Sequence, residues 1–377
     1  MKFRIDRDAL AEAVAWTART LPARPTVPVL AGMRLDVGDR LTLSSFDYEV
    51  SAQASVDVGA GEPGSALVSG RLLADITRSL PPEPVEVTSD GAKIVLACGG
   101  NTFTLQTLPV EDYPALPDLP PVAGTIASDA FAAAARQVAV AAARDDGLPL
   151  LTGMHVEIDD ETVTLVCTDR YRVAVRELRW QPARPGVSAT ALVPAKSLAD
   201  TARSLASGAE MSITLGGADD AGGMIGFDSG NRHITTRLLT EQFVKYNAYF
   251  PTEFSALAEV AAAPLAEAIK RVSLVAERNT PVRLSFSQGQ VVLEAGTGDE
   301  AQAVATLAAT LDGDDISVAF NPQFLLDGLA PLGSGTARLQ LTTPTKPAVL
   351  TGRPTEGSES SAAPGYRYLA MPVRLSA

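Results

Sequence analysis

One pattern occurs three times in this chain, and this repetition constrains the fold more than any other feature. The three copies are LVSGRLLADITRSL (67–80), LVPAKSLADTARSL (192–205) and VAFNPQFLLDGLAPL (318–332). Their aspartates, Asp75, Asp200 and Asp327, lie 125 and 127 residues apart, and a leucine follows each of them five positions later. The period is therefore about a third of the 377 residues, which predicts three copies of one structural unit.

A second segment repeats in the same phase. Its copies are PVLAGMRLDV (28–37), PLLTGMHVEI (149–158) and PVRLSFSQGQVVLEA (281–295). Each follows an Ala- and Leu-rich stretch with apolar residues about 3.6 positions apart, which predicts a helix. Alternating apolar and polar residues then favour strands at 40–58 and 161–178. Together the two patterns predict six helices: 6–21, 71–80, 129–144, 196–205, 265–278 and 322–332.

The repeated unit is thus a helix, several strands, a second helix and further strands. Proline-rich stretches at 116–124 and 249–255 separate the copies. A chain of 377 residues also exceeds the roughly 250–300 residues at which one hydrophobic core stops growing. We therefore predict an α+β fold of three domains, with boundaries at 1–121, 122–250 and 251–377.

The chain closes on an apolar tail, YRYLAMPVRLSA (366–377), although a free terminus is usually polar and frayed. A Ser/Gly-rich stretch, 355–365, precedes the tail and is predicted to be a mobile surface loop. Such a loop lets the tail fold back onto the body of the protein.

The composition is that of a globular protein, with 46% hydrophobic and 20% charged residues. No run of 18 apolar residues occurs, and the charged first segment does not match a signal peptide, so we expect a cytoplasmic protein without a membrane span. Cys98 and Cys167 each lie in an apolar run, which is typical of buried strand thiols rather than of disulfides or metal ligands.

Two patterns that could indicate a cofactor or metal lack the required context. The stretch GAGEPG (59–64) fits G-x-G-x-x-G, but it contains Pro63 and does not open a helix after a strand. His155 and His233 have no ligand spacing to each other or to the cysteines. We therefore expect no cofactor and no metal.

Acidic pairs are the remaining candidates for catalysis. Asp145 with Asp146, and Asp219 with Asp220, lie beside glycine in turn-like stretches, where a solvated loop is the simpler interpretation. An enzyme that uses these pairs is one competing hypothesis, and it would require metal-dependent turnover that is lost on mutation of Asp145 and Asp146.

Positive charge is concentrated on the predicted helices. The net charge is -13, which by itself argues against a protein that binds nucleic acid, because phosphate contacts need local positive charge. The six helices nevertheless carry eleven Lys or Arg against nine Asp or Glu, whereas the rest of the chain carries 20 against 35. These cations fit ordinary solvated helix faces, or a basic inner surface that holds a polyanion.

Five segments carry a family resemblance: MKFRIDRDAL (1–10), ARPTVPVLAGMRLDV (23–37), TLPVEDYPALP (107–117), CTDRYRVAV (167–175) and YLAMPVRL (368–375). In this order they resemble the bacterial sliding clamp, the beta subunit of DNA polymerase III. The match spans essentially the whole chain, and its details are similar to those of actinobacterial members.

The resemblance implies the DNA clamp fold, in which three-domain protomers join head to tail into a homodimeric ring. Twelve helices line the channel and antiparallel sheets form the outside. Double-stranded DNA is encircled and held by topology, so the ring slides without sequence readout. Such a protein is a processivity factor that a clamp loader places on DNA, and it has no catalytic site of its own.

The resemblance also implies a role for the tail. In the family, the tail lies beside the T-D-x-x-R segment and forms a groove for short apolar peptides from the DNA polymerase III catalytic subunit, the clamp loader and other proteins with a clamp-binding motif. The residues assigned to the groove are Leu151, Thr168, Arg170, Tyr171, Arg172, Val173, Val244, Tyr249, Leu369, Met371, Pro372, Val373, Arg374 and Leu375. The alternative for the tail is a terminal edge strand, and both can hold.

Two further sets of residues are expected at surfaces. Those expected to face DNA are Arg24, which matches a DNA-contacting position of the family, and the helical Arg71, Arg78, Arg136, Lys196, Arg203, Lys270 and Arg271. Those expected at the dimer interface are Phe103 and Leu105 on the first domain, and Leu274 and Val275 on the third domain of the second copy. Solvated loops and ordinary core packing are the respective alternatives.

Several positions near the groove depart from the family pattern. Val244 stands where many relatives have proline, and Ala370 is smaller than the usual branched residue. Asn247 and Ala248 stand where basic residues are common. These departures suggest an alternative, a second, variant clamp with altered peptide or inhibitor binding. A monomeric peptide-binding scaffold without DNA is a further hypothesis.

Overall fold

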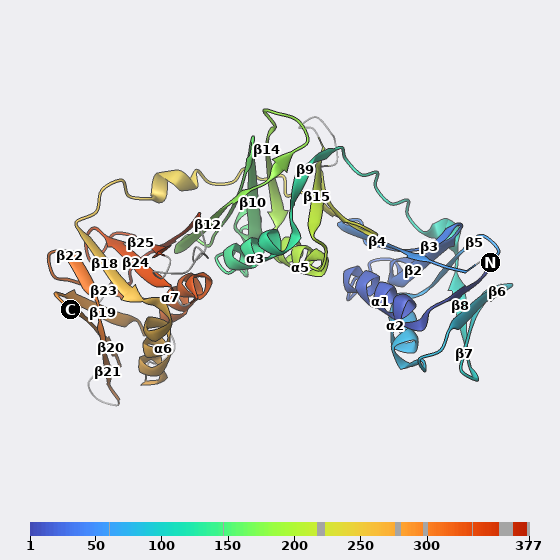
Figure 1. The fold of residues 1–377 in the computed structure, drawn as a ribbon, viewed down its shortest axis with the longest axis horizontal. Helices are drawn as coiled ribbons and strands as arrows, with labels where there is room; N and C mark the ends of the chain where they lie inside the picture. The colour runs from blue at the N-terminus through green and yellow to red at the C-terminus, as the bar shows by residue number, and fades with distance from the viewer. Residues whose placement is uncertain are drawn as a thin grey trace. The chain divides into compact units, whose positions relative to one another are not determined.

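The computed structural model describes residues 1–59, 61–145, 147–216, 223–275, 280–296, 301–333, 335–353 and 365–374. These residues form antiparallel sheets and short helices in two compact units (Figure 1). The first unit contains Met1–Asp129, Gln181–Pro185 and Asp200–Leu238, and the second contains Ala130–Trp180, Gly186–Ala199 and Leu239–Ala377.

The first unit is built on a sheet of 13 strands in the order β1-β6-β7-β8-β5-β2-β3-β4-β17-β16-β15-β9-β13. Its strands are β1 (Lys2–Ile5), β2 (Gly32–Val37), β3 (Arg40–Phe46), β4 (Val50–Asp57), β5 (Gly64–Ser69), β6 (Val85–Asp90), β7 (Lys93–Cys98), β8 (Asn101–Leu108), β9 (Val122–Ala127), β13 (Gln181–Pro182), β15 (Glu210–Leu215), β16 (Met224–Ser229) and β17 (Arg232–Arg237). The pairing of β4 with β17 continues the sheet from the first repeat into the second.

Two helices, α1 (Arg7–Thr17) and α2 (Gly70–Ser79), pack side by side against the first unit's sheet (Figure 1). The Asp6 side chain caps α1 by accepting hydrogen bonds from the amides of Asp8 and Ala9. Each helix turns an apolar stripe to the sheet, with Leu10 of α1 and Leu73 of α2 both 1% exposed. The predicted amphipathic pattern is therefore what holds these helices on the sheet.

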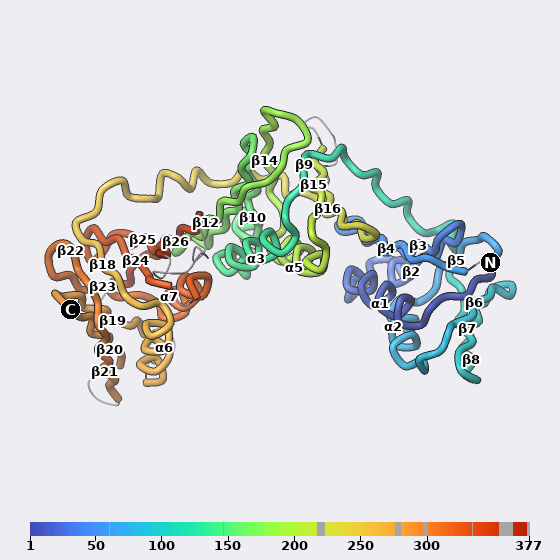
Figure 2. The backbone as a smooth tube through the Cα atoms, in the orientation of Figure 1, coloured from blue at the N-terminus to red at the C-terminus, as the bar shows by residue number. Residues whose placement is uncertain are grey.

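The second unit contains a sheet of nine strands, β14-β10-β11-β12-β26-β25-β24-β18-β22, and one of four, β21-β20-β19-β23. The strands are β10 (Gly153–Asp159), β11 (Thr162–Thr168), β12 (Arg172–Arg179), β14 (Ser188–Pro194), β18 (Ala256–Ala261), β19 (Val282–Ser287), β20 (Gln290–Ala295), β21 (Ala303–Ala308), β22 (Thr310–Gly313), β23 (Ile316–Phe320), β24 (Thr336–Leu341), β25 (Ala348–Arg353) and β26 (Tyr366–Ala370). Strand β26 lies between β12 and β25 (Figure 2), so the apolar tail begins as an inner strand rather than an edge strand.

Helices α6 (Ala262–Val272) and α7 (Pro322–Leu329) pack together in the second unit, and the single turn α4 (Pro149–Thr152) precedes β10. Helices α3 (Ser128–Ala139) and α5 (Ala195–Leu205) each contribute residues to both units. Short 3₁₀ turns extend or connect these elements: η1 (Ala18–Thr20), η2 (Pro28–Ala31), η3 (Val110–Asp112), η4 (Tyr246–Tyr249), η5 (Ser273–Val275) and η6 (Ala330–Leu332).

All six predicted helices are confirmed, with shifts at their ends. The helix predicted at 129–144 stops at Ala139, because Ala141 and Ala142 donate to carbonyls three residues back and so tighten the last turn. The helix predicted at 265–278 begins earlier, at Ala262. Of the loop predicted at 355–365, only Gly365 lies within the described residues.

The three repeats do not appear as three separate compact bodies. Strand pairs β4–β17 and β12–β26 each join strands from neighbouring repeats, so the middle repeat is shared between two units. The predicted boundaries at 121 and 250 remain a prediction.

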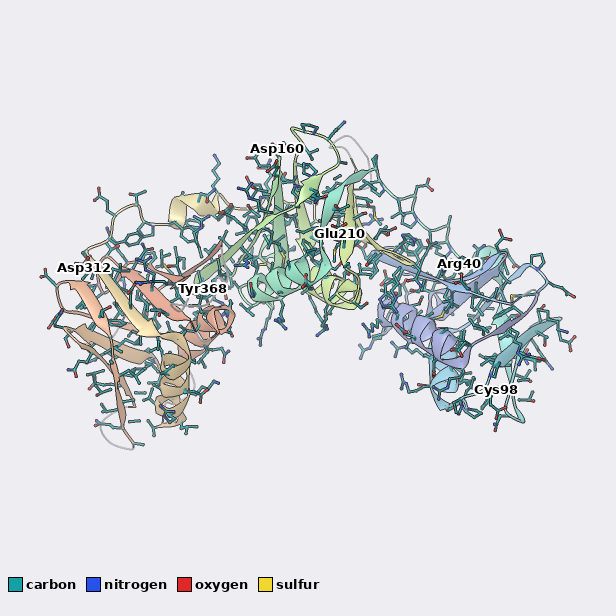
Figure 3. The ribbon with its side chains drawn as sticks, viewed as in Figure 1. Arg40, Cys98, Asp160, Glu210, Asp312 and Tyr368 are labelled. Carbon is teal, nitrogen blue, oxygen red and sulfur yellow. The ribbon has the colours of Figure 1, made fainter. Side chains whose placement is uncertain are left out.

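The two cysteines are buried free thiols, as predicted. Cys98 ends β7 (Figure 3) and its thiol lies 3.2 Å from the Glu83 carbonyl. Burial raises the pKa of the Cys167 thiol, so this sulfur is an unreactive core group. In the described part of the chain, no helix is long and apolar enough to cross a membrane.

Candidate functional site

A groove of about 480 Å³ opens on one face of the second unit's large sheet. Its lining residues are Leu151, Thr168, Arg170, Val173, Val244, Ala248, Tyr249, Pro347, Leu369 and Met371. Eight of these were assigned to the groove by the resemblance. The resemblance did not assign Ala248 and Pro347 to the groove. Ala248 departs from the family pattern, and Pro347 lies in the turn before β25, where no sequence pattern indicated a binding site.

The groove residues of β12 and β26 lie on one face of the sheet, because successive side chains along a strand point to opposite faces. Val173 of β12 lies directly opposite Leu369 of β26, and both side chains point to the groove face. Their neighbours Ala174 and Tyr368 are also paired and point to the opposite face, where the Tyr368 ring lies against Gly328 of α7. The groove floor is therefore formed jointly by a strand of the second repeat and a strand of the third.

An apolar cluster supports this floor. Its buried members are Val166, Val173, Val175, Tyr246, Val349 and Leu369, and Phe243, Val244, Phe250, Phe254 and Met371 pack against them. The phenol of Tyr246 donates to Glu157 Oε2 at 3.2 Å, and burial raises its pKa to about 12. Val244 and Tyr249, on either side of this tyrosine in the chain, remain available to line the groove.

The turn from Thr168 to Arg172 forms one wall, and its own side chains fix its shape. Asp169 Oδ1 accepts hydrogen bonds from the amides of Tyr171 and Arg172, at 3.0 and 3.1 Å. Thr168 Oγ1 donates to the Arg172 carbonyl at 2.7 Å and accepts from the Arg170 amide at 3.2 Å. Arg170 has a φ of 79°, an uncommon conformation for a residue other than glycine. The wall is thus held in one backbone shape before any ligand binds.

Arg172 does not line the groove, which corrects its assignment. As a residue of β12 adjacent to Val173, its side chain leaves on the opposite face, where it pairs with Asp169 and Asp327 at 3.0 and 2.5 Å. Burial opposes the charge of Arg172, but Tyr368, Asp327 and Asp169 outweigh it, so the pKa of the guanidinium lies above its usual value. Arg172 is a buried structural cation behind the groove wall.

The tail beyond β26 is tied to the body by its backbone. The Met371 amide donates to the Tyr171 carbonyl and the Val373 amide to the Ala319 carbonyl, both at 2.8 Å. Tyr171, Pro372, Val373 and Arg374 are not among the residues that line this cavity, and Tyr171 is 57% exposed, so their assignment to the groove stays a prediction. Leu375 lies outside the described residues.

The residues expected to face DNA are all exposed. Three of them pair with an acidic residue three positions earlier on the same helix: Arg78 with Asp75 (3.9 Å), Arg203 with Asp200 (2.5 Å) and Lys270 with Glu267 (2.8 Å). Arg71 donates to the Pro22 carbonyl at 3.1 Å. Among the described residues, no carboxylate lies at ion-pair distance from Arg24, Arg136, Lys196 or Arg271.

The residues assigned to the dimer interface differ in exposure. Leu274 is 84% exposed and Phe103 and Val275 are partly exposed, as an interface requires. Leu105 is only 2% exposed, because its side chain points into the core of its own domain, so its assignment is corrected to core packing. The stretch 101–106 of β8 pairs on one side only, with β7, and β21 is an outer strand of its sheet.

A second cavity, of about 530 Å³, lies in the first unit and contains none of the assigned residues. Glu12 of α1 pairs there with Arg232 of β17, whose guanidinium lies over the Trp16 ring. Within the described ranges, no cluster of His, Cys, Asp and Glu could hold a metal ion. Asp145 accepts a hydrogen bond from the Gly147 amide, whereas Asp146, Asp219 and Asp220 lie outside the described residues.

Family models match this chain along almost its whole length. The N-terminal, central and C-terminal domains of the DNA polymerase III beta subunit match residues 1–117, 125–245 and 247–366. These matches follow the three repeats in order.

Individual relatives agree with the family models. The beta sliding clamp of Streptomyces coelicolor is 57% identical over 377 residues, and the beta sliding clamp homolog GriR of Streptomyces muensis is 45% identical over 375, covering 100% and 99% of both chains. A crystal structure of the Pseudomonas aeruginosa sliding clamp bound to griselimycin superposes with a TM-score of 0.90 at 27% identity, covering 100% of both chains. Because the family models cover the three repeats in order and a full-length relative is 57% identical, the chain belongs to the DNA polymerase III beta subunit family of sliding clamps.

Proposed function

We propose that the groove beside β12 and β26 captures short apolar peptides of replication and repair proteins while the protein encircles DNA. As a member of the sliding clamp family, the chain is a processivity factor of DNA replication and not an enzyme. The observation that carries the proposal is the preformed groove of about 480 Å³ whose floor combines two repeats.

The lining supports peptides of apolar character. Leu151, Val173, Val244 and Leu369 offer aliphatic contacts, and Met371 adds a flexible side chain that adapts to different partners. Thr168 and Arg170 supply a few polar groups that can orient a bound backbone. We propose the DNA polymerase III catalytic subunit, the clamp loader and other proteins with a clamp-binding motif as the partners.

The ring is proposed to close through β8 and β21. Each of these strands leaves backbone groups of a sheet edge unpaired by neighbouring strands of the described chain, and a head-to-tail contact between two copies would satisfy both. Phe103 would then meet Leu274 and Val275 of the second copy. We further propose 1–121, 122–250 and 251–377 as the domain limits, and a cytoplasmic location.

Inside the ring, Arg24 and the exposed helix cations are proposed to face the DNA phosphates. Phosphate contacts carry no sequence information, which fits a ring that slides. Topology rather than affinity would then retain the ring on DNA.

A second candidate is a variant clamp with altered inhibitor binding. It is favoured by the 45% identical homolog GriR, and by the griselimycin-bound relative, since two residues that depart from the common pattern, Val244 and Ala248, line the groove. Asn247 and Ala370 do not line it. A griselimycin competition assay against the same organism's other clamp, where one exists, tests this: equal affinities would remove the variant hypothesis.

The main proposal is tested by fluorescence polarisation with a labelled peptide from the polymerase's clamp-binding motif. The full chain is compared with a chain ending at Ala370, because a cut at Tyr368 would also remove two residues of β26. Saturable binding that is lost on truncation, with the dimer mass unchanged, is the expected result. Absence of binding by the full chain would contradict the proposed groove.

A further inference from the structure

We propose that Asp327 of α7 is a positioning residue for the groove, because it holds Arg172 and thereby the turn from Thr168 to Arg172 that forms the groove wall. The proposal rests on the proposed function of the groove. It makes peptide capture depend on a helix that contributes no residue to the groove lining.

The three repeats show that this aspartate has acquired a different contact. Asp75 and Asp200 occupy the same repeat position, and each pairs with an arginine three residues later on its own exposed helix. Their side chains are 74% and 52% exposed. In the third repeat the residue three positions later is Ala330, so Asp327 has no cation there.

Asp327 instead reaches Arg172, 155 positions away in the chain. The two side chains are only 18% and 7% exposed, so water screens their attraction far less than that of the two surface pairs. In the third repeat, the ion pair at this position therefore stabilises the turn from Thr168 to Arg172 in the second repeat. It does not stabilise the helix that carries the aspartate.

The contact fixes both side chains in one orientation. Asp327 Oδ2 accepts from Arg172 at 2.5 Å, while Oδ1 accepts from Gln323 Nε2 at 2.7 Å. Arg172 also donates to Asp169, to the Tyr368 hydroxyl at 3.3 Å and to the Val140 carbonyl. Its guanidinium lies 4.4 Å from the centre of the Phe324 ring, also on α7.

Arg172 transmits this constraint to the groove wall through the backbone. The Arg172 amide and guanidinium both donate hydrogen bonds to Asp169, and the Arg172 carbonyl accepts one from Thr168. Three groups of one residue therefore stabilise the turn. The turn contains Arg170 at its unfavourable φ of 79°, a conformation that persists only where surrounding contacts enforce it. Removing the Asp327 carboxylate would loosen these contacts, and the wall would lose its preorganisation.

The experiment compares Asp327→Asn with the control Asp200→Asn. Asp200 occupies the equivalent position of the second repeat, and its substitution removes a carboxylate from an exposed ion pair. An asparagine at 327 can still accept from Arg172 through its carbonyl oxygen, and its NH₂ group can donate to Gln323 if the glutamine amide turns, so the substitution chiefly removes the negative charge opposite Arg172. With the labelled polymerase peptide, we expect Asp327→Asn to weaken binding about tenfold and Asp200→Asn less than about twofold. Asp327→Glu should restore most of the affinity because it retains the carboxylate.

Hydrogen exchange separates positioning from a general loss of stability. In Asp327→Asn without peptide, the amides of Tyr171 and Arg172 should exchange faster, whereas those of β10 and β11 should be unchanged. If Asp327→Asn does not fold, the milder Gln323→Leu at an exposed position removes only the bond that orients Asp327, and about a twofold loss of affinity is expected.

The possible failures are distinguishable. If the wild-type chain binds the peptide and Asp327→Asn binds as tightly as Asp200→Asn does, the positioning role is wrong and the groove stands. If the wild-type chain does not bind, the proposed function fails and this inference fails with it. Faster exchange throughout the second unit would also overturn the inference, because it would indicate a purely structural ion pair.

Discussion

Two turns of this molecule are built alike and used differently. The turn from Phe46 to Val50 joins β3 to β4, and the turn from Thr168 to Arg172 joins β11 to β12, 122 positions later. In each, the aspartate at the second position accepts two backbone amides, and the third residue has a positive φ, 74° at Tyr48 and 79° at Arg170.

The next repeat is tied to each turn in the same way. The Arg237 amide donates to the Glu49 carbonyl, and the Met371 amide donates to the Tyr171 carbonyl, both at 2.8 Å. The two junctions between repeats, at the strand pairs β4–β17 and β12–β26, therefore share one backbone arrangement.

Side chains make the first junction a core and the second a groove. Phe46 is buried, and its amide donates to the Tyr113 hydroxyl at 2.7 Å, which draws that ring onto the turn. In the second junction Thr168 stands at the position of Phe46. A threonine side chain is smaller than a phenylalanine side chain, and this difference leaves room for the groove at the second junction.

The largest expected effect comes from emptying the filled junction. Phe46→Ala should destabilise the first unit by about 3–5 kcal/mol, the usual cost of removing a buried phenyl ring. The slowest-exchanging amides of β3 measure this change. Peptide affinity at the other junction should stay at the wild-type value, and a parallel loss of affinity would show that the two junctions are not independent.

Filling the open junction is the converse change. Thr168→Phe introduces the first junction's ring into the groove and should weaken peptide binding by at least about 2 kcal/mol, since the ring occupies the ligand's volume. Fluorescence polarisation measures the affinity. Thr152→Phe, at a residue outside the lining, is the control, and unchanged binding by Thr168→Phe would contradict the explanation by filling.

The positive φ shared by the two turns gives a smaller effect. Glycine relieves the Cβ strain at such a position but loses more entropy on folding, so Tyr48→Gly and Arg170→Gly should each change stability by less than about 1 kcal/mol, in the same direction. Urea unfolding monitored by hydrogen exchange measures both. Only Arg170→Gly should alter peptide affinity, because only Arg170 lines the groove.

The smallest effect concerns a pair of equivalent strand positions, Arg34 and His155. Arg34 pairs with Asp36 at 2.9 Å, whereas His155 stacks on Phe243 with 4.9 Å between ring centres. Burial lowers the pKa of His155 below 6.5, partly offset by Glu157, so the unfolded chain takes up this proton at a higher pH than the folded chain.

The stability linked to the neutral imidazole of His155 is therefore complete above pH 6.5 and is lost as the pH falls below it. An NMR titration should give a midpoint below 6.5 for this imidazole. The chain has two histidines, so His155→Gln assigns the signals. A midpoint at or above 6.5 would contradict the buried, stacked environment.

Much of this architecture could be predicted from the sequence because it depends on local pattern. Apolar spacing predicted all six helices, and the repeat period predicted three copies. The groove depended on the resemblance to the family, since Leu151, Val244 and Leu369 lie far apart in the chain and nothing local brings them together.

The error at Arg172 has a physical cause, strand parity. Consecutive strand residues point to opposite faces, so membership of a functional segment does not say which face a side chain takes. Arg172 was assigned to the groove, but its side chain is buried on the face opposite to that of Val173. Leu105 has the same parity as Phe103, and its burial follows instead from packing within its own domain. Pairing between repeats was also unpredictable, because β4–β17 and β12–β26 depend on register between distant strands.

The local ion pairs on α2, α5 and α6 have a consequence for the thermodynamics of binding a polyanion. Each phosphate that a free cation neutralises releases condensed counterions, which makes association strong at low salt and steeply salt-dependent. Arg78, Arg203 and Lys270 already carry an anion from their own helix, so contact with phosphate would exchange one anion for another and release few ions. Contact through these three cations would add little to the salt dependence of binding, which would come from Arg24, Arg136, Lys196 and Arg271, the cations without an ion-pair partner among the described residues.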